Sequence, residues 1–407
     1  SRPLRVFAGL LAWTSGAGWL GDAAQAADPL AFRTQEIATD LGVGYAVKLV
    51  DMNADKQLDV LVVDTNRVIW YENPSWKVHT VIKDQTELDN VCIDAMDIDG
   101  DGRLDLALGA HWKPSDTVNS GSLQWLEPGK NADDLWTVHP IDREPTIHRL
   151  RFIDLEGDGK SELIVVPLQG PGTKAPEWTQ AGVRILSYSI PADPRKDRWR
   201  RTVLNEEMHV CHNFIGTDLN DDKRLDLVVT SFEGVNLLER GENNLWKRTL
   251  IGTGNQATRP NRGASEIKRG FLSPTSDYLA TIEPWHGTQV VVYHRPKSGE
   301  PLWQRQVVDE DLKWGHAVWC VDLDGDQTQE LVIGVRDTKS DSAPCGVRIY
   351  KADPSDPTAW KAQRIDPAGV AVEDLACADL NGDGKPEIVA VGRATKNVRI
   401  YWNEAAK

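Results

Sequence analysis

The sequence has few cysteines, an excess of negative charge and none of several common catalytic motifs. Its five cysteines leave at least one thiol unpaired, and none stands in a Cys-x-x-Cys pair that would indicate a metal site. A net charge of −15 argues against nucleic acid or an anionic membrane as partner. No Gly-x-Ser-x-Gly, P-loop or Rossmann glycine pattern occurs, so the chemistries that depend on them have no support.

The N-terminal residues have the pattern of an export signal. Arg2 and Arg5 precede an apolar run over residues 6–20, and Ala24-Gln25-Ala26 is typical of a cleavage site. A buried N-terminal helix is the alternative. The run is too short and too interrupted to span a bilayer, and no other stretch is apolar enough to do so. We therefore expect a signal peptide over residues 1–26 and an exported (periplasmic or secreted) domain over residues 27–407.

An acidic segment, Asp-x-Asp/Asn/Glu-x-Asp followed by a further acid, recurs along the chain. Its first acids are Asp51, Asp97, Asp154, Asp218, Asp322 and Asp379. The gap between Asp218 and Asp322 is about twice the others, and residues 263–281 supply a degenerate copy inside it. A repeat of this length is one supersecondary unit of a larger array.

Each copy has the residue pattern of four short strands. One apolar segment precedes the acidic loop, a second follows it, a third ends in an aromatic residue, and a fourth carries tryptophan in a polar alternation. Four strands per repeat are typical of a propeller blade. Seven sets occur with only six fourth strands, and residues 31–37 supply the missing one. The sequence predicts an all-β protein, a single seven-bladed β-propeller with four antiparallel strands per blade and a ring closed by the N-terminal strand.

The acidic loops place oxygen ligands at alternate positions, as a hard cation requires. We expect calcium, or magnesium, to have a structural role there. The alternative is that Asp and Asn act only as turn formers. The expected ligands are Asp97, Asp99, Asp101, Asp105, Asp154, Glu156, Asp158, Glu162, Asp322, Asp324, Asp326, Glu330, Asp379, Asn381, Asp383 and Glu387.

Histidines recur six residues before the first acid of a repeat. Equivalent positions on the innermost strands of a propeller form a ring, and here they hold Tyr45, Val91, His148, His212, a residue near Glu266, His316 and Glu373. Converging neutral imidazoles are ligands of zinc or another divalent transition metal. The sequence predicts a metal held by His148, His212 and His316, with a polar channel mouth free of metal as the alternative.

The loops between second and third strands open on the same face as this ring. They carry His111, Glu233, Trp285, His286, Arg336 and Arg393. Acids, bases, cations and aromatic rings around a central pit fit a polyhydroxylated, sugar-like ligand. Glu233, Trp285 and His111 are therefore the expected substrate-binding residues.

The acidic repeats resemble the FG-GAP or VCBS class of propellers. The segments IHRLRFIDLEGDG (147–159), RGASEI (262–267), TIEPWHGTQVVVY (281–293) and GHAVW (315–319) resemble the propeller, or dehydratase, domain of the aldos-2-ulose dehydratase family. The resemblance implies a zinc ion at the base of a cleft, with His148, His212 and His316 as ligands, and dehydration of keto-sugars.

The resulting hypothesis is a carbon–oxygen lyase that performs metal-assisted β-elimination on a keto-sugar or keto-glycoside. His286 is the first choice for the base and Glu373 the second, Tyr45 is the expected acid, and Arg336 and Arg393 position oxygens. Two alternatives remain, a polysaccharide lyase acting on a uronic-acid polymer and a non-catalytic propeller that binds carbohydrate or protein. Substrate, stereochemistry and oligomeric state stay open.

Overall fold

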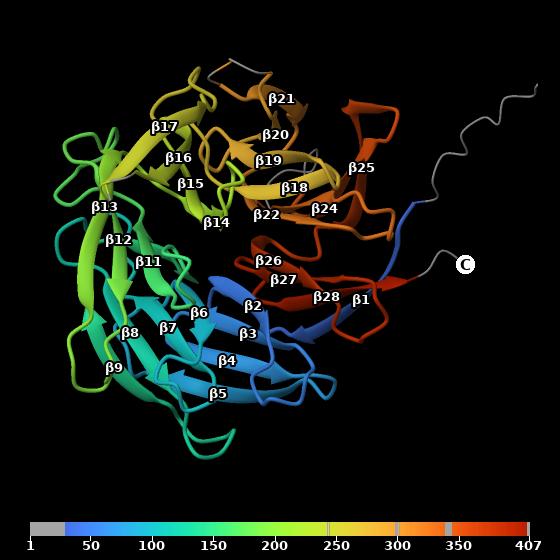
Figure 1. The fold of residues 1–407 in the computed structure, drawn as a ribbon. Coiled ribbons are helices and arrows are strands. Elements are labelled where there is room, and N and C mark those ends of the chain that lie inside the picture. Colours follow the sequence, from blue (N-terminus) through green and yellow to red (C-terminus); the bar gives the residue numbers. More distant parts are fainter. Residues whose placement is uncertain are drawn as a thin grey trace, which may run out of the picture.

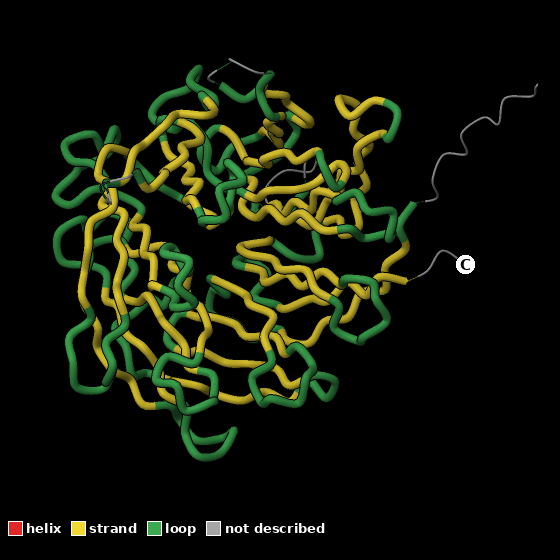
Figure 2. The backbone as a smooth tube through the Cα atoms, viewed as in Figure 1, coloured by secondary structure: helices red, strands yellow, loops and turns green. Residues whose placement is uncertain are grey.

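The computed structural model describes residues 29–241, 243, 245–297, 300, 302–337 and 344–404. Within these ranges it has 28 strands in seven four-stranded antiparallel sheets, and no helix. The sheets stand around a common axis (Figure 1), and the backbone is divided between strand and loop (Figure 2). The predicted seven-bladed propeller is confirmed. The expected export signal lies outside the described residues, and in the ranges above no helix could cross a membrane.

Each of blades one to six is a run of four consecutive strands. Blade one comprises β2 (Ala46–Val50), β3 (Asp59–Asp64), β4 (Arg67–Glu72) and β5 (Lys77–Lys83). Blade two comprises β6 (Cys92–Met96), β7 (Asp105–Ala110), β8 (Ser122–Glu127) and β9 (Thr137–Asp142). Blade three comprises β10 (Ile147–Ile153), β11 (Glu162–Pro167), β12 (Val183–Ser189) and β13 (Arg200–Met208).

The second half of the ring continues this order and includes the degenerate copy. Blade four comprises β14 (Asn213–Thr217), β15 (Asp226–Ser231), β16 (Gly234–Arg240) and β17 (Trp246–Gly252). Blade five, the degenerate copy, comprises β18 (Lys268–Ser273), β19 (Ser276–Glu283), β20 (Gln289–His294) and β21 (Gln304–Asp309). Blade six comprises β22 (Gly315–Val321), β23 (Glu330–Val335), β24 (Gly346–Asp353) and β25 (Asp356–Pro367).

Blade seven joins the two ends of the described chain. It comprises β26 (Val372–Ala378), β27 (Glu387–Gly392), β28 (Val398–Glu404) and β1 (Ala31–Ala38). Strand β1 pairs antiparallel with β28, with Ala31 opposite Glu404 and Gln35 opposite Ile400. Figure 1 shows the blue β1 beside the red β28. The predicted closure is confirmed, and it removes the open edges that a first and last blade would otherwise present.

The core consists of layers between neighbouring blades. Successive side chains of a strand point to opposite faces of its sheet. In β3, Val60 and Val62 pack in a cluster with residues of blade seven, whereas Leu61 and Val63 pack in a cluster with residues of blade two. Each second strand is therefore apolar on both faces, which explains its unbroken run of β-branched and aliphatic residues.

The last acid of each acidic loop has a structural role in holding the loop. Its carboxylate accepts the backbone N–H of the residue seven positions earlier, at 2.7–3.2 Å in all six loops. In five of the six loops this acid is buried at the start of a second strand, for example Asp105 in β7 and Glu387 in β27, whereas Glu162 in β11 is half-buried. The bond ties the loop to the sheet and explains the fixed spacing of the motif.

All five cysteines are free, and four of them are buried. Burial raises the pKa of the Cys92 thiol to about 12, so this group stays protonated. These cysteines act as small hydrophobic residues of the blades.

Candidate active site

One cavity of about 190 Å³ lies on the axis, at the ends where the innermost strands begin. It is lined by six of the seven positions that the spacing predicted to form a ring: Tyr45, Val91, His148, His212, His316 and Glu373. Arg149 of β10 and side chains of the loops complete the lining, the latter being Trp112, Pro114, Leu168, Trp285, His286, Trp314, Arg336 and Arg393. The structure therefore brings together most of the residues that the sequence selected.

Three of the ring residues are the extra residues of β-bulges. The register of β10 shifts between Ile147 and Arg149, which leaves His148 without an opposite residue in β11. The same shift occurs around His316 in β22 and around Glu373 in β26. A bulge re-aims side chains at the end of a ladder, and this local geometry turns these three toward the axis.

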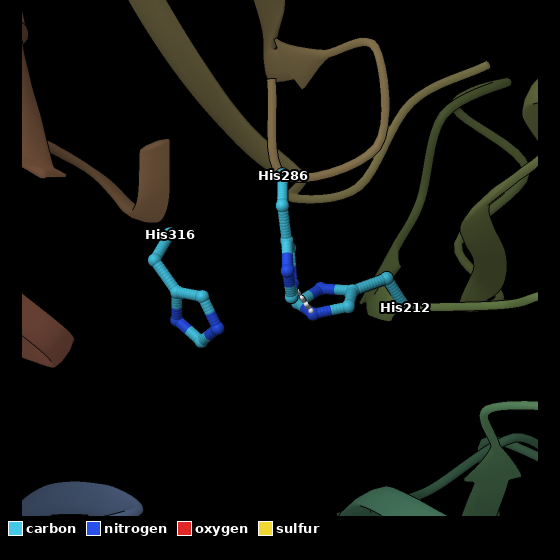
Figure 3. A group of neighbouring side chains, drawn as sticks. All are labelled: His212, His286 and His316. Atoms are coloured by element: carbon cyan, nitrogen blue, oxygen red, sulfur yellow. Dashed lines mark hydrogen bonds between the residues drawn. The ribbon is translucent and has the colours of Figure 1, made fainter. Parts of the chain in front are cut away.

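Three imidazoles from consecutive blades converge in this cavity. His212 precedes β14, His286 lies in the loop between β19 and β20, and His316 lies in β22. One ring nitrogen from each lies within 4.8 Å of the others, and Nε2 of His212 is 2.5 Å from Nε2 of His286 (Figure 3). Such a set can hold a metal that prefers nitrogen ligands.

The loop that carries His286 is tightly constrained. His286 has a positive φ of 50°, which is uncommon for a non-glycine residue. An added Cβ on the following Gly287 would lie 2.2 Å from the carbonyl oxygen of Pro284. Only glycine fits at that position, so the Trp285-His286-Gly287 sequence fixes where the imidazole points.

Neighbouring acceptors determine which ring nitrogens are free. Nδ1 of His316 donates to the carbonyl oxygen of Glu373 at 2.5 Å, and Nδ1 of His212 lies 2.8 Å from Oε1 of Glu266. The contact between His212 and Glu266 is close, but neither of its two atoms forms a hydrogen bond. With protons on Nδ1, both rings keep an Nε2 lone pair for a ligand position, an arrangement typical of metal-binding histidines.

The four histidines of the cavity are neutral. Burial is the main cause that holds the pKa of His148, His212, His286 and His316 well below the ordinary range, and nearby Arg149, Arg336 and the other imidazoles add to it. Neutral imidazole is the form that binds a metal or accepts a proton.

His148 lies at the ring position that the spacing predicted, and its role as a metal ligand stays a prediction. It lines the cavity, and its ring centroid is 4.6 Å from that of His212, but it is not among the three converging histidines. Its Nδ1 donates to the carbonyl oxygen of His212 at 3.0 Å, and the guanidinium of Arg149 lies 3.2 Å from its Nε2. The third histidine of the group is His286, because the loop between β19 and β20 of blade five reaches the cavity.

Glu373 and Tyr45 also line the cavity, and each has charged partners. Oε1 of Glu373 lies 3.9 Å from Nε2 of His316, a member of the histidine group. Glu373 accepts hydrogen bonds from Arg393 at 2.7 Å and Arg336 at 3.1 Å. The hydroxyl of Tyr45 donates to Asp89 at 3.1 Å. Burial raises the pKa of Tyr45, so its hydroxyl keeps the proton at neutral pH.

Two of the three expected substrate-binding residues lie outside the cavity lining. Glu233 accepts a hydrogen bond from Ser231 and contacts the ring of His209, and His111 is bonded to Arg143. Trp285 lines the cavity and stacks on His286, with ring centroids 4.0 Å apart. The sequence analysis missed Trp314, which is 38% exposed at the cavity, and its position two residues before His316 was the only signal.

The acidic loops differ in how well they fit a cation. Oxygens of Asp97, Asp99 and Asp101 lie within 4.8 Å of one another, and the buried Oδ1 of Asp105 has no hydrogen-bond partner. This donor set suits a hard cation. In blade six, Asp322, Asp324 and Glu330 converge similarly. A basic side chain contacts each set: Arg195 contacts Asp99 in blade two, and Lys351 contacts Asp324 and lies 2.8 Å from Asp326 in blade six.

Two segments of the chain match known protein families. Residues 51–108 match the FG-GAP-like repeat, and the fold around them is a seven-bladed propeller. Residues 120–296 match the family described as aldos-2-ulose dehydratase, beta-propeller domain. The chain is also 25% identical, over 374 residues, to the aldos-2-ulose dehydratase of Phanerodontia chrysosporium. That match covers 86% of this chain and 40% of the relative, and it confirms the resemblance to the dehydratase propeller.

Proposed function

We propose that this protein is a carbon–oxygen lyase that removes water from a keto-sugar or keto-glycoside. The observation that carries the proposal is the convergence of His212, His286 and His316 in an axial cavity. The similarity to a dehydratase propeller supports the reaction class, since the relative is named for that activity. We further propose that the protein is exported, because residues 1–26 have the pattern of a signal peptide.

A divalent transition metal, zinc first, fits the three histidines. Their rings are neutral, and acceptors beside Nδ1 of His212 and His316 leave Nε2 available. The buried Nδ1 of His286 has no hydrogen-bond partner, so this ring has no competing interaction through that atom. Zinc supplies Lewis-acid polarisation of a substrate carbonyl, which acidifies the neighbouring C–H.

The chain itself supplies the proton acceptor. With His286 in the ligand group, His148 is the lining histidine whose Nε2 is left for this task, and its low pKa keeps it neutral at pH 7. The α-proton passes to this nitrogen when a substrate displaces the Arg149 contact. Glu373 is bound by two guanidinium groups, so its role is to hold Arg336 and Arg393 in position.

The leaving hydroxyl needs a proton, and Tyr45 carries one. Its raised pKa keeps the hydroxyl protonated at neutral pH, and it lines the same cavity as His148. Proton loss from the α-carbon and hydroxide loss from the β-carbon together release water and leave a carbon–carbon double bond. The guanidinium groups of Arg336 and Arg393 bind the oxygens of the substrate.

Aromatic side chains suit a sugar ring. Trp112, Trp285 and Trp314 line the cavity, and the guanidinium of Arg336 lies 5.1 Å from the ring of Trp314. Sugar rings present apolar C–H faces that pack against such surfaces, while hydroxyl groups turn to the polar side chains.

The test combines metal analysis with an elimination assay. The purified protein, loaded with zinc, is offered keto-sugars, keto-glycosides and uronic-acid polymers, and the ultraviolet absorbance of the unsaturated product is followed. Activity on keto-sugars supports the proposal. Activity on anionic polymers alone selects a polysaccharide lyase, whereas ligand binding without turnover and without a transition metal selects a binding propeller.

A further inference from the structure

A second cavity of about 210 Å³ continues along the axis from the first. The two share Val91 and Arg149 in their linings. Its walls are the innermost strands, which surround the middle of the ring in Figure 1. It is lined by four cationic side chains, Lys48, Arg149, Arg151 and Lys268, and by two acidic ones, Glu266 and Asp374.

The acids of this region already have donors. Asp374 accepts the backbone N–H groups of Val47 and Leu375, each at 3.0 Å. Asp94, next to the cavity, accepts a hydrogen bond from Lys48 at 2.9 Å. Glu266 accepts one from Asn213 and lies against His212. The remaining oxygen of Glu266, Oε1, forms no hydrogen bond and lies 2.8 Å from Nδ1 of His212 and 3.7 Å from Nη2 of Arg149. No carboxylate among the described residues forms an ion pair with Arg151 or Lys268.

Arg151 is only partly satisfied by its neighbours. Its Nη2 donates to Oδ1 of Asn213 at 2.9 Å, and its guanidinium lies 4.6 Å from the ring of Phe214. Its Nη1 is buried and has no hydrogen-bond partner. A buried guanidinium donor without an acceptor is costly, because it has lost its hydrogen bonds to water and gained none in return.

Lys268, which is half-buried, lines the same cavity. Its ammonium lies 4.1 Å over the ring of Trp319, and it makes no ion pair within the part of the chain that the structure describes. Burial, and then the charges of Arg151 and Lys48, lower its pKa to about 8. Two cations that repel each other thus face one cavity with unused donors.

We propose that a small monovalent inorganic anion, of the halide class, binds in this cavity between the Arg151 guanidinium and the Lys268 ammonium. Four cations stand against three carboxylates when Asp94 is included, so one negative charge balances the region. The volume accommodates such an ion with several waters. An anion that bridges both cations satisfies their donors and removes their mutual repulsion.

The first test is crystallographic and uses the full chain with bromide as the probe. An anomalous bromide peak in contact with Nη1 of Arg151 and the ammonium of Lys268 is expected. A map that shows only water at this place in high bromide overturns the proposal. The result does not depend on the histidine group, so it stands or falls separately from the lyase proposal.

The second test measures the equilibrium in solution. Thermal unfolding is followed in sodium bromide and, at equal ionic strength, in the sodium salt of a sulfonate buffer too large for the cavity. Bromide at about 100 times its dissociation constant is expected to raise the folding equilibrium constant about 100-fold. Lys268→Met is expected to lose this response, whereas Lys130→Met, an equal charge change on the exposed surface, is expected to keep it.

An equal response in Lys268→Met and Lys130→Met overturns the proposal, because the effect would then come from the surface. If Lys268→Met does not fold, the bromide map of the unaltered protein decides.

Discussion

The two ends of the innermost strands carry opposite chemistry. At one end, six near-identical loops hold carboxylates that mostly accept their own backbone N–H groups. At the other end, equivalent positions hold different residues in each blade, and three histidines converge there. The repeated loop stabilises six of the seven blades, whereas departure from the repeat marks the place where one asymmetric site is built.

The largest effect is expected from the histidines, and it separates two assignments of their roles. His286→Ala is expected to lose both bound zinc and elimination activity. His148→Ala is expected to keep near-stoichiometric zinc and to lose about 100-fold or more in kcat, as removal of a general base does. Metal content by plasma mass spectrometry and kcat are measured on both. Zinc lost from His148→Ala and kept in His286→Ala would restore the ligand set that the sequence predicted.

A smaller effect is expected from Glu266, which lies against Nδ1 of His212. Glu266→Gln removes the charge that orients this ring and is expected to weaken zinc binding about 10–100-fold. Competition with a chelator measures the affinity, and circular dichroism verifies that the fold is kept. Unchanged zinc affinity would show that the carboxylate serves only the axial cavity.

At the opposite end, the expected effect is on stability. Asp105→Ala removes the bond to the N–H of Ile98 and is expected to lower the free energy of unfolding by about 1–3 kcal/mol. Asp101→Ala, in the same loop but exposed, is expected to change it by about 0.5 kcal/mol or less without calcium. Denaturant unfolding in chelator measures both. Equal losses would contradict a special role for the last acid.

The effect of calcium on stability tests the Asp97–Asp105 loop further. If the Asp97–Asp105 loop binds it, as its donor set suggests, added calcium stabilises the unaltered protein and not Asp101→Ala. Titration calorimetry and the unfolding midpoint in calcium measure this. Identical stabilisation of the two proteins would leave these acids as turn formers.

The last effect is a pH dependence of stability that arises in the axial cavity. The pKa of Lys268 is lowered from 10.5 to about 8 in the folded protein, so the folded state binds fewer protons than the unfolded chain between these values. Stability from this group therefore rises with pH over that interval, by at most about 1.4 kcal/mol per pH unit. The difference in unfolding free energy between unaltered protein and Lys268→Met measures it in bromide-free buffer. A difference that stays constant from pH 8 to 10.5 would contradict the lowered pKa.

The seven-bladed fold and the ring of inner-strand residues around the axis could be predicted from the sequence. The acidic spacing, the strand pattern and the missing fourth strand predicted seven blades closed by residues 31–37, and all of this is confirmed. It also selected Tyr45, His148, His212, His316 and Glu373 as neighbours, because equivalent positions of a repeat are related by the symmetry of the ring.

Which side chains come into contact in the axial cavity is visible only in the folded structure. Loops do not follow the repeat, so nothing in the sequence could show that His286 reaches His212 while Glu233 and His111 turn to partners of their own. The bulges at His148, His316 and Glu373 also depend on pairing with the next strand. Spacing along a chain fixes which residues share a register, whereas distances within a few ångströms depend on backbone geometry that the packed ring imposes.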